Sequence, residues 1–377
     1  MAVPFIDLRR FEPGFLERWA AKSAEVAANT MFIGGPEATR LEQRLAAEAG
    51  VPAVVGCANG TDALQLALRA IDVAEGDIVL VPDSTFWATF EAVVNVGARP
   101  VTVDIDMADL AMDFELFQQA VRQYRPKAAI LVHLYGWGSA RLHEYRAFCR
   151  QEGVFLVEDG AQCHGVTFRG QSIYKGARLA TTSFYPAKVI GACGDAGAVY
   201  CEDEKLATVV RQLGNHGRTT HYGHGLVGWN SRLGGYDAAY LNLCLDHADA
   251  RLASRRRVAA LYRERLAAMG VEIVAPPDGY VENGYLNVTL QDPAARPAIE
   301  AVLKQHGIGF GNVYPGAMSK QPGAARWIAG QVGGEKADAL ARSVLNLPLF
   351  AYMTDPEIDE VLAVLAKALQ EVHATAG

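Results

Sequence analysis

The sequence lacks any apolar run of the roughly 18 residues that a membrane-spanning helix needs. Asp7, Arg9 and Arg10 stand where a secretory signal would require an apolar stretch, so we expect a cytoplasmic protein with no membrane partner. The sequence has 35 basic and 42 acidic residues. Because the net charge is negative, we do not expect the protein to bind nucleic acid through its overall charge. A local basic site for an anionic ligand remains compatible with this charge.

Several short motifs are also missing. The six cysteines form no C-x-x-C pair, so we expect neither a metal site nor a disulfide framework, and their apolar neighbours favour buried free thiols. There is no G-x-G-x-x-G or Walker phosphate loop, so dinucleotide or ATP binding is not indicated. The 377 residues, 50% hydrophobic and 20% charged, exclude disorder and suggest about two folded domains.

Between residues 50 and 200, short apolar segments alternate with helical patterns. Apolar strands separated by helices predict an α/β fold in which a mostly parallel sheet lies between two layers of helices, giving three layers in all. Ligands of such sheets collect at the carboxyl ends of the strands. The predicted strands span residues 53–56, 78–81, 98–103, 128–134, 154–157 and 181–185.

The pattern changes after about residue 236. A long helix is predicted over residues 238–269, and it contains the basic run Arg255-Arg256-Arg257. We therefore predict a large domain over residues 1–250 and a smaller C-terminal α+β domain over residues 251–377. The elements expected in the smaller domain are strands at 272–274, 285–290 and 309–313, and helices at 298–306 and 355–372.

Polar residues follow the first and fifth of these strands. Residues 57–64 (Cys-Ala-Asn-Gly-Thr-Asp-Ala-Leu) lead through Gly60 into a helix, whose free N–H groups suit a phosphate. Alternatively, Thr61 or Asp62 is an ordinary helix cap. Glu158 and Asp159 end a buried strand, where a carboxylate can bind a metal, act as a base, pair with a protonated ring nitrogen or cap a helix.

Lys188 lies just beyond the strand predicted at 181–185, in a glycine-rich loop. A desolvated lysine there can form a Schiff base with a carbonyl such as that of pyridoxal phosphate, whereas a solvated loop lysine has no such role. Pyridoxal phosphate needs an anion cradle, a carboxylate, an aromatic ring and an amine. In chain order, the candidates are the residue 57–64 cradle, Phe86, Asp159, Ser183 and Lys188.

In these segments the sequence resembles the DegT/StrS family of pyridoxal-phosphate-dependent nucleotide-sugar aminotransferases, which have the fold type I aminotransferase architecture. The resemblance extends over nearly the whole chain. Within the family, the motifs are most similar to those of enzymes that aminate C3 of a UDP-linked 3-keto-hexuronate. It includes residues 4–8 (Pro-Phe-Ile-Asp-Leu), 32–37, 228–233, 314–315, 320–322 and 345–349.

The resemblance implies a role for each matching residue. Lys188 would form the Schiff base and move protons, and Asp159 would pair with the pyridine nitrogen. Asn230 would reach the cofactor phosphate of the neighbouring subunit, which makes the unit a homodimer with shared active sites. The other implied contacts are Gln162 at the phenolic oxygen, Phe86 on the ring, Gly60, Thr61 and Ser183 at the phosphate, and Tyr314 and Lys320 at the substrate.

The implied reaction moves an amino group from glutamate to C3 or C4 of a nucleotide-linked keto-sugar in amino-sugar biosynthesis. The alternatives are another pyridoxal phosphate enzyme, such as a sugar dehydratase, and a regulatory protein without catalysis. Some family members that deoxygenate sugars carry His where this chain has Lys188, so the lysine favours amine transfer. The sequence departs from the family at Trp137, at Cys163 and at residues 317–319, and we expect these departures to bear on the sugar pocket.

Overall fold

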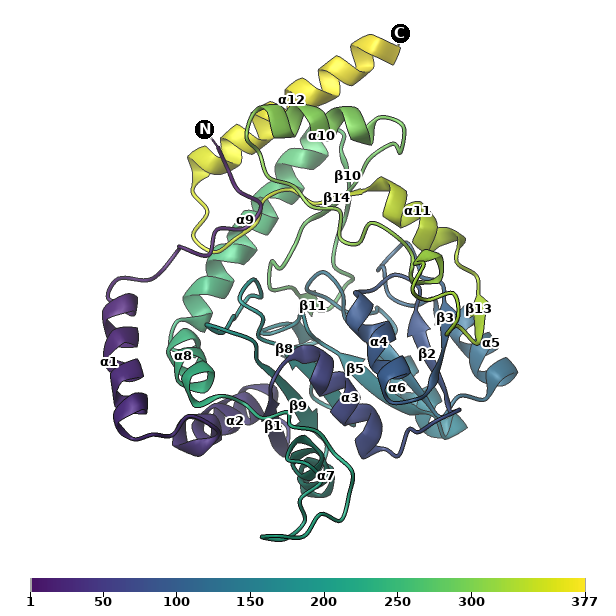
Figure 1. The fold of residues 1–377 in the computed structure, drawn as a ribbon. Coiled ribbons are helices and arrows are strands. Elements are labelled where there is room, and N and C mark those ends of the chain that lie inside the picture. Colours follow the sequence, from purple (N-terminus) through teal and green to yellow (C-terminus); the bar gives the residue numbers. More distant parts are fainter. Residues whose placement is uncertain (1, 377) are drawn as a thin grey trace.

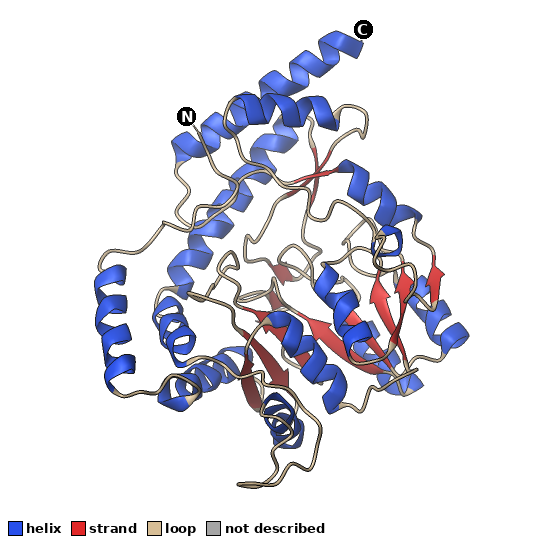
Figure 2. Ribbon diagram, in the orientation of Figure 1, coloured by secondary structure: helices blue, strands red, loops and turns tan. Residues whose placement is uncertain are grey.

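The computed structural model describes residues 2–376 and is built on an eight-stranded sheet, shown in red in Figure 2. Its strands lie in the order β1-β9-β8-β5-β4-β2-β3-β13. They span Ala53–Cys57 (β1), Ile78–Pro82 (β2), Arg99–Val103 (β3), Ala128–Val132 (β4), Phe155–Asp159 (β5), Leu179–Ser183 (β8), Gly197–Cys201 (β9) and Gly330–Val332 (β13).

The sheet is mostly parallel, as predicted. From β8 through β5, β4, β2 and β3 to β13 the neighbouring strands are parallel, whereas β9 runs antiparallel to both β1 and β8. Strand β9 was not predicted, because Gly197–Cys201 follows a glycine-rich loop that masks its short apolar pattern. Strand β13 was missed too, since Gly330–Val332 is only three residues long.

Helices cover both faces of this sheet. Strand residues alternate between two apolar clusters, so that Leu80 packs into one while Val79 and Val81 pack into the other. This double burial explains why the strands read as continuous apolar runs. The first cluster includes residues of α2 (Gly35–Ala49), α5 (Phe114–Tyr124), α6 (Leu142–Glu152) and α8 (Gly235–Leu245); the second includes residues of α3 (Gly60–Ala70), α4 (Trp87–Asn95), α7 (Glu204–Gly214) and α11 (Glu335–Ser343).

The C-terminal part has a core of its own. Tyr262, Leu303 and Leu365 belong to a third apolar cluster, which Val3 from the other end of the chain joins. Figure 1 shows this part above the main sheet, with both termini close to it. Its elements are α9 (Ala248–Ala268), α10 (Arg296–Gln305), α12 (Asp355–Ala376) and the small sheet of β10 (Glu272–Val274), β12 (Val288–Leu290) and β14 (Val344–Leu345).

Two predicted elements of this part were wrong. The single helix over 238–269 is divided into α8 and α9, because the chain breaks its helix at Asp246 and His247. The strand predicted over 309–313 is reduced to an isolated bridge between Gly311 and Asn346. The domain boundary at residue 250 remains a prediction, although β13 from beyond it joins the large sheet.

The remaining elements complete the chain. They are α1 (Phe15–Ala28), the 3-10 turn η1 (Met318–Lys320), and a small sheet of β6 (Thr167–Phe168), β7 (Gln171–Ser172) and β11 (Tyr280–Val281). Within residues 2–376, no helix combines the length and apolar character needed to cross a membrane. Five of the six cysteines are buried free thiols, as predicted, and Cys193 is exposed.

Candidate active site

A cavity of about 360 Å³ opens where β4, β5 and β8 end. The register of the parallel strands aligns Val132, Asp159 and Thr181, so the residues at and just beyond these ends meet at one edge of the sheet. Most of the predicted site residues line this cavity. They are Gly60, Thr61, Phe86, Asp159, Gln162, Ser183, Lys188 and Tyr314.

One wall of the cavity is the N-terminus of α3. Asn59 caps this helix, because its side-chain oxygen accepts a hydrogen bond from the Asp62 N–H at 2.8 Å; the predicted cap at Thr61 or Asp62 was wrong. The first-turn N–H groups of Gly60 and Thr61 have no acceptor within the helix and can bind an anion. A Cβ atom at Gly60 would lie 2.7 Å from Ser183 Cβ, so glycine keeps this cradle open.

Asp159 also lines the cavity and is buried at the end of β5. Its carboxylate accepts hydrogen bonds from the Ala161 N–H at 3.0 Å and from the Thr89 hydroxyl at 3.1 Å. Burial raises the pKa of Asp159, while these two hydrogen bonds act in the opposite direction. A protonated nitrogen placed against this carboxylate would compensate its desolvation.

Lys188 reaches the same cavity from the loop after β8, and its side chain is half-buried. Its Nζ donates to the Tyr285 hydroxyl at 3.4 Å and lies 5.1 Å from the centre of the Tyr285 ring. Within residues 2–376, Nζ forms no ion pair with a carboxylate. The amine is therefore held in place by a weak contact and is free to attack a carbonyl.

Gln162 is fixed by contacts at both ends of its amide. Its oxygen accepts a hydrogen bond from the Tyr135 N–H at 2.7 Å, and its nitrogen donates to the Tyr314 hydroxyl at 3.0 Å. The Phe86 ring lies 5.5 Å from the Tyr314 ring and is 55% exposed at the cavity mouth. These side chains leave the cavity flanked by aromatic rings, a surface on which a flat heterocycle can stack.

A buried ion pair supports the strand that carries Asp159. Glu158 points to the other face of the sheet, because successive strand residues alternate. Its carboxylate binds the Arg146 guanidinium at 2.7 and 2.8 Å and His133 Nε2 at 2.9 Å. Burial by itself would raise the pKa of Glu158, but Arg146 and His133 outweigh it and hold this pKa at about 2.

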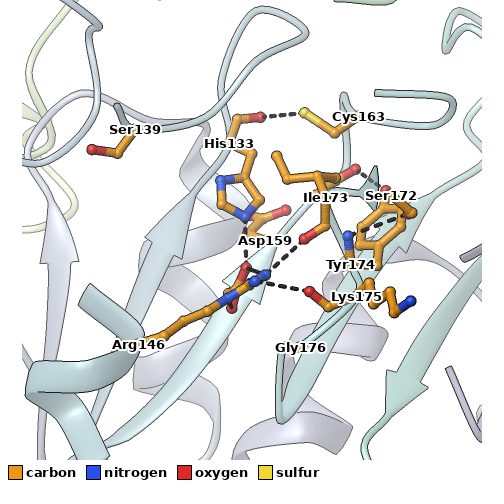
Figure 3. A network of polar contacts seen from close by, with 12 residues as sticks. His133, Ser139, Arg146, Asp159, Cys163, Ser172, Ile173, Tyr174, Lys175 and Gly176 are labelled. Carbon is orange, nitrogen blue, oxygen red and sulfur yellow. Dashed lines mark hydrogen bonds and ion pairs between the residues drawn. The ribbon is translucent and has the colours of Figure 1, made fainter. Parts of the chain in front are cut away.

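Figure 3 shows Arg146 extending from its helix toward Ile173 and Lys175, with the His133 ring above it. Arg146 donates to the carbonyl oxygens of these two residues at 2.7 and 2.8 Å. From the sequence, Glu158 belongs to an acidic pair, but no partner could be assigned to it. Arg146 lies on a helix, where its position resembles that of an ordinary surface residue. Thr89 and Tyr285 were missed likewise, since neither carries a motif.

Two predicted site residues lie outside the cavity. Asn230 is exposed and forms a bridge with Asn215, at the base of the loop that projects below α7 in Figure 1. Lys320 is exposed at the end of η1. Trp137 does not line the cavity either; it is buried and its indole N–H donates to the Asp109 carbonyl at 2.8 Å.

Comparison with known proteins identifies the family. The family model described as "DegT/DnrJ/EryC1/StrS aminotransferase family" matches residues 17–366. The chain is 36% identical to the UDP-2-acetamido-2-deoxy-3-oxo-D-glucuronate aminotransferase of Pseudomonas aeruginosa, over 96% of this chain and 99% of that protein. The chain therefore belongs to the DegT/DnrJ/EryC1/StrS aminotransferase family.

Solved structures agree with this assignment. DesV of S. venezuelae superposes with a TM-score of 0.92 at 32% identity, covering 97% of this chain and 98% of that one. The Bacillus subtilis protein NtdA, solved with bound cofactor PMP, superposes with a TM-score of 0.90 at 26% identity, covering 98% of this chain and 85% of that one. The fold prediction is confirmed, and the protein is an aminotransferase that uses pyridoxal phosphate.

The cavity fits this cofactor. Gly60 leaves room for a phosphate at the start of α3, where a Cβ atom would fill the space against Ser183. The buried Asp159 carboxylate suits a protonated pyridine nitrogen, and the unpaired amine of Lys188 suits the aldehyde. Each of these groups therefore has the chemistry that one part of pyridoxal phosphate requires.

Proposed function

We propose that this protein transfers an amino group from glutamate to a keto-sugar linked to a nucleoside diphosphate. The observation that carries the proposal is the cavity itself, in which an unpaired lysine amine, a buried carboxylate and an open helix N-terminus converge. When bound, pyridoxal phosphate supplies the electron sink that lets an amino group leave one carbon and later join another.

The residues around the cavity have distinct tasks in this proposal. Lys188 would hold the cofactor at its aldehyde, and its Nζ would accept the proton from the α-carbon of the donor and release it again. Asp159 keeps a proton on the ring nitrogen, and the Thr89 hydroxyl orients its carboxylate. The Gln162 amide donates a hydrogen bond to the Tyr314 hydroxyl. This contact would hold the amide for binding the phenolic oxygen of the cofactor.

Four further residues would hold the phosphate and cover the ring. Gly60 and Thr61 offer backbone N–H groups, and Ser183 lies directly opposite Gly60. The Ser183 hydroxyl accepts a hydrogen bond from the Tyr185 N–H at 3.2 Å, which leaves its own proton for a phosphate oxygen. Phe86 stands at the mouth of the cavity, where it can cover one face of the ring.

For the acceptor, we propose a UDP-linked sugar with a ketone at C3. Support comes from the Pseudomonas aeruginosa relative, whose name states a UDP-linked 3-oxo-glucuronate. Tyr314 lines the cavity beside Phe86 and would contact the sugar. Lys320 is exposed, and we propose that it meets the anionic part of the substrate.

We further propose a homodimer with shared active sites. Asn230 does not reach the cavity of its own chain, yet it stands at the base of a projecting loop. Large apolar side chains are exposed on this loop and on the segment before α2, a surface suited to burial against a second copy. They are Met31, Phe32, Ile33, Tyr222 and Val227, with exposed fractions between 46% and 88%.

The acceptor is tested with a panel of keto-sugars linked to UDP, GDP and dTDP. The protein is first converted with glutamate, which should remove its visible absorbance, and each sugar is then added. The UDP-linked 3-keto sugar should restore the absorbance fastest. Faster restoration by a 4-keto sugar or by a dTDP sugar would refute the proposed acceptor, and failure of glutamate to change the spectrum would refute the donor.

A further inference from the structure

A second cavity of about 250 Å³ adjoins the first. Lys188 lines both cavities, so the second one lies next to the residue that carries the reactive amine. Its lining is rich in cations, which come from the N-terminal segment and from α9. Its charged residues are Asp7, Arg10, Lys188, Arg251 and Arg255.

Two of these arginines are already neutralised. Arg10 pairs with Asp7 at 2.9 Å and also contacts Glu357. Arg251 binds both oxygens of Glu12, at 2.7 and 2.8 Å. These pairs are fully formed, so neither cation needs a further anion.

Arg255 differs from both. Its side chain is buried, and it donates to the carbonyl oxygens of Gly284 at 3.1 Å and Leu349 at 3.5 Å. Its Nε atom is buried without a hydrogen-bond partner, and within residues 2–376 no carboxylate forms an ion pair with its guanidinium. Burial lowers the pKa of Arg255 to about 10, which leaves the group charged at neutral pH.

The neighbouring arginines of the same run are less buried than Arg255. Arg256 donates to the carbonyl oxygens of Glu282 at 2.6 Å and Gly165 at 2.8 Å. Arg257 is exposed and pairs with Asp355 at 2.5 Å. Within residues 2–376 Arg256 has no carboxylate partner either, but Arg255 is the buried member of the run and the one whose Nε has no hydrogen-bond partner.

Arg255 is also connected to the reactive amine. It donates to the carbonyl of Gly284, and the next residue, Tyr285, accepts a hydrogen bond from Lys188 Nζ. A buried guanidinium without an anion is costly, and its planar fork matches a carboxylate. An amino acid carries its α-carboxylate one carbon away from the amine that must react beside Lys188.

We infer that Arg255 binds the α-carboxylate of the amino donor in this second cavity. The inference rests on the proposed transamination and adds to it the residue that recognises the donor. Losing a charge-assisted hydrogen-bonded pair weakens binding by about 10- to 100-fold. Arg255→Gln should therefore raise the glutamate concentration for half-conversion by about that factor.

The experiment compares Arg255→Gln with Arg255→Lys and with Arg256→Gln as the matched control. Loss of visible absorbance measures the glutamate step, and its return measures the keto-sugar step. Arg255→Gln should weaken the glutamate step and leave half-saturation by the sugar unchanged. Arg255→Lys should restore part of the loss, and Arg256→Gln should resemble the parent protein.

Binding of glutarate, which has carboxylates but no amine, gives a readout independent of turnover. Calorimetry should detect glutarate binding to the parent protein and a loss of affinity in Arg255→Gln. Crystals of the parent protein soaked in glutarate should show a carboxylate on the Arg255 guanidinium. A carboxylate bound elsewhere, unchanged glutamate dependence in Arg255→Gln, or an effect confined to the sugar step would each overturn the inference. If the parent protein does not react with glutamate at all, the proposed function fails instead.

Discussion

The ion pair behind Asp159 gives a quantitative test of how the site is supported. Arg146→Met keeps much of the side-chain length but removes the cation that faces Glu158. The two side chains are 7% and 1% exposed, so the remaining carboxylate would be buried without its main partner. Breaking such a pair typically costs about 3–5 kcal/mol of unfolding free energy.

The pKa of Glu158 leads to a similar magnitude. Its depression from 4.5 to about 2 corresponds to about 3 kcal/mol of stabilisation at neutral pH. Because the folded pKa is lower than the unfolded one, this stabilisation is complete above about pH 4.5 and is lost as the pH falls toward 2. The stability difference between the parent protein and Arg146→Met should therefore shrink over that pH range.

The assay is denaturant unfolding of the cofactor-loaded proteins, followed by tryptophan fluorescence. Arg265→Met is the control, because its ion pair with Asp359 is at the surface, with side chains 39% and 61% exposed. It should change the unfolding free energy by about 1 kcal/mol or less. The double variant Arg146→Met/Glu158→Leu should recover much of the loss, since it leaves no unpaired charge. If Arg146→Met is as stable as Arg265→Met, the Arg146–Glu158 ion pair does not stabilise the fold as we expect.

Three further predictions concern the cofactor. Gly60→Ala should weaken pyridoxal phosphate binding by about 1–3 kcal/mol, measured by equilibrium dialysis, because its Cβ would lie 2.7 Å from Ser183 Cβ; unchanged affinity would contradict the cradle. Asp159→Asn should retain the fold but lower kcat by about 100- to 1000-fold, and full activity would show that its charge is not needed. Asn230→Ala mixed with Lys188→Ala should regain about a quarter of parental activity if sites are shared between subunits, and no recovery would place Asn230 in its own chain's site.

The six strands predicted for the large sheet agree with the structure to within two residues at either end, because burial on both faces makes each a continuous apolar run. Strand β9 was not predicted, because Gly197 and the glycines before it are typical of a loop. The break between α8 and α9 could not be predicted, because Asp246 and His247 do not interrupt a regular spacing of apolar residues in the sequence. Tertiary packing, which the local pattern does not record, decides such boundaries.

The site was predictable where local chemistry is unusual. Lys188 and Asp159 stand at strand ends, and the parallel register brings them to one cavity. The partners of Asp159 and Glu158 were not predictable, because Thr89 and Arg146 come from helices that only the fold places nearby. Asn230 does not line the cavity of its own chain, so the role that we propose for it depends on a second copy.

The role of Lys188 is tested most directly by borohydride reduction of the cofactor-loaded protein followed by peptide mass spectrometry. The protein should be yellow, and reduction should permanently attach its cofactor to the peptide that contains Lys188. Attachment at any other lysine, or release of all cofactor after reduction, would contradict this role.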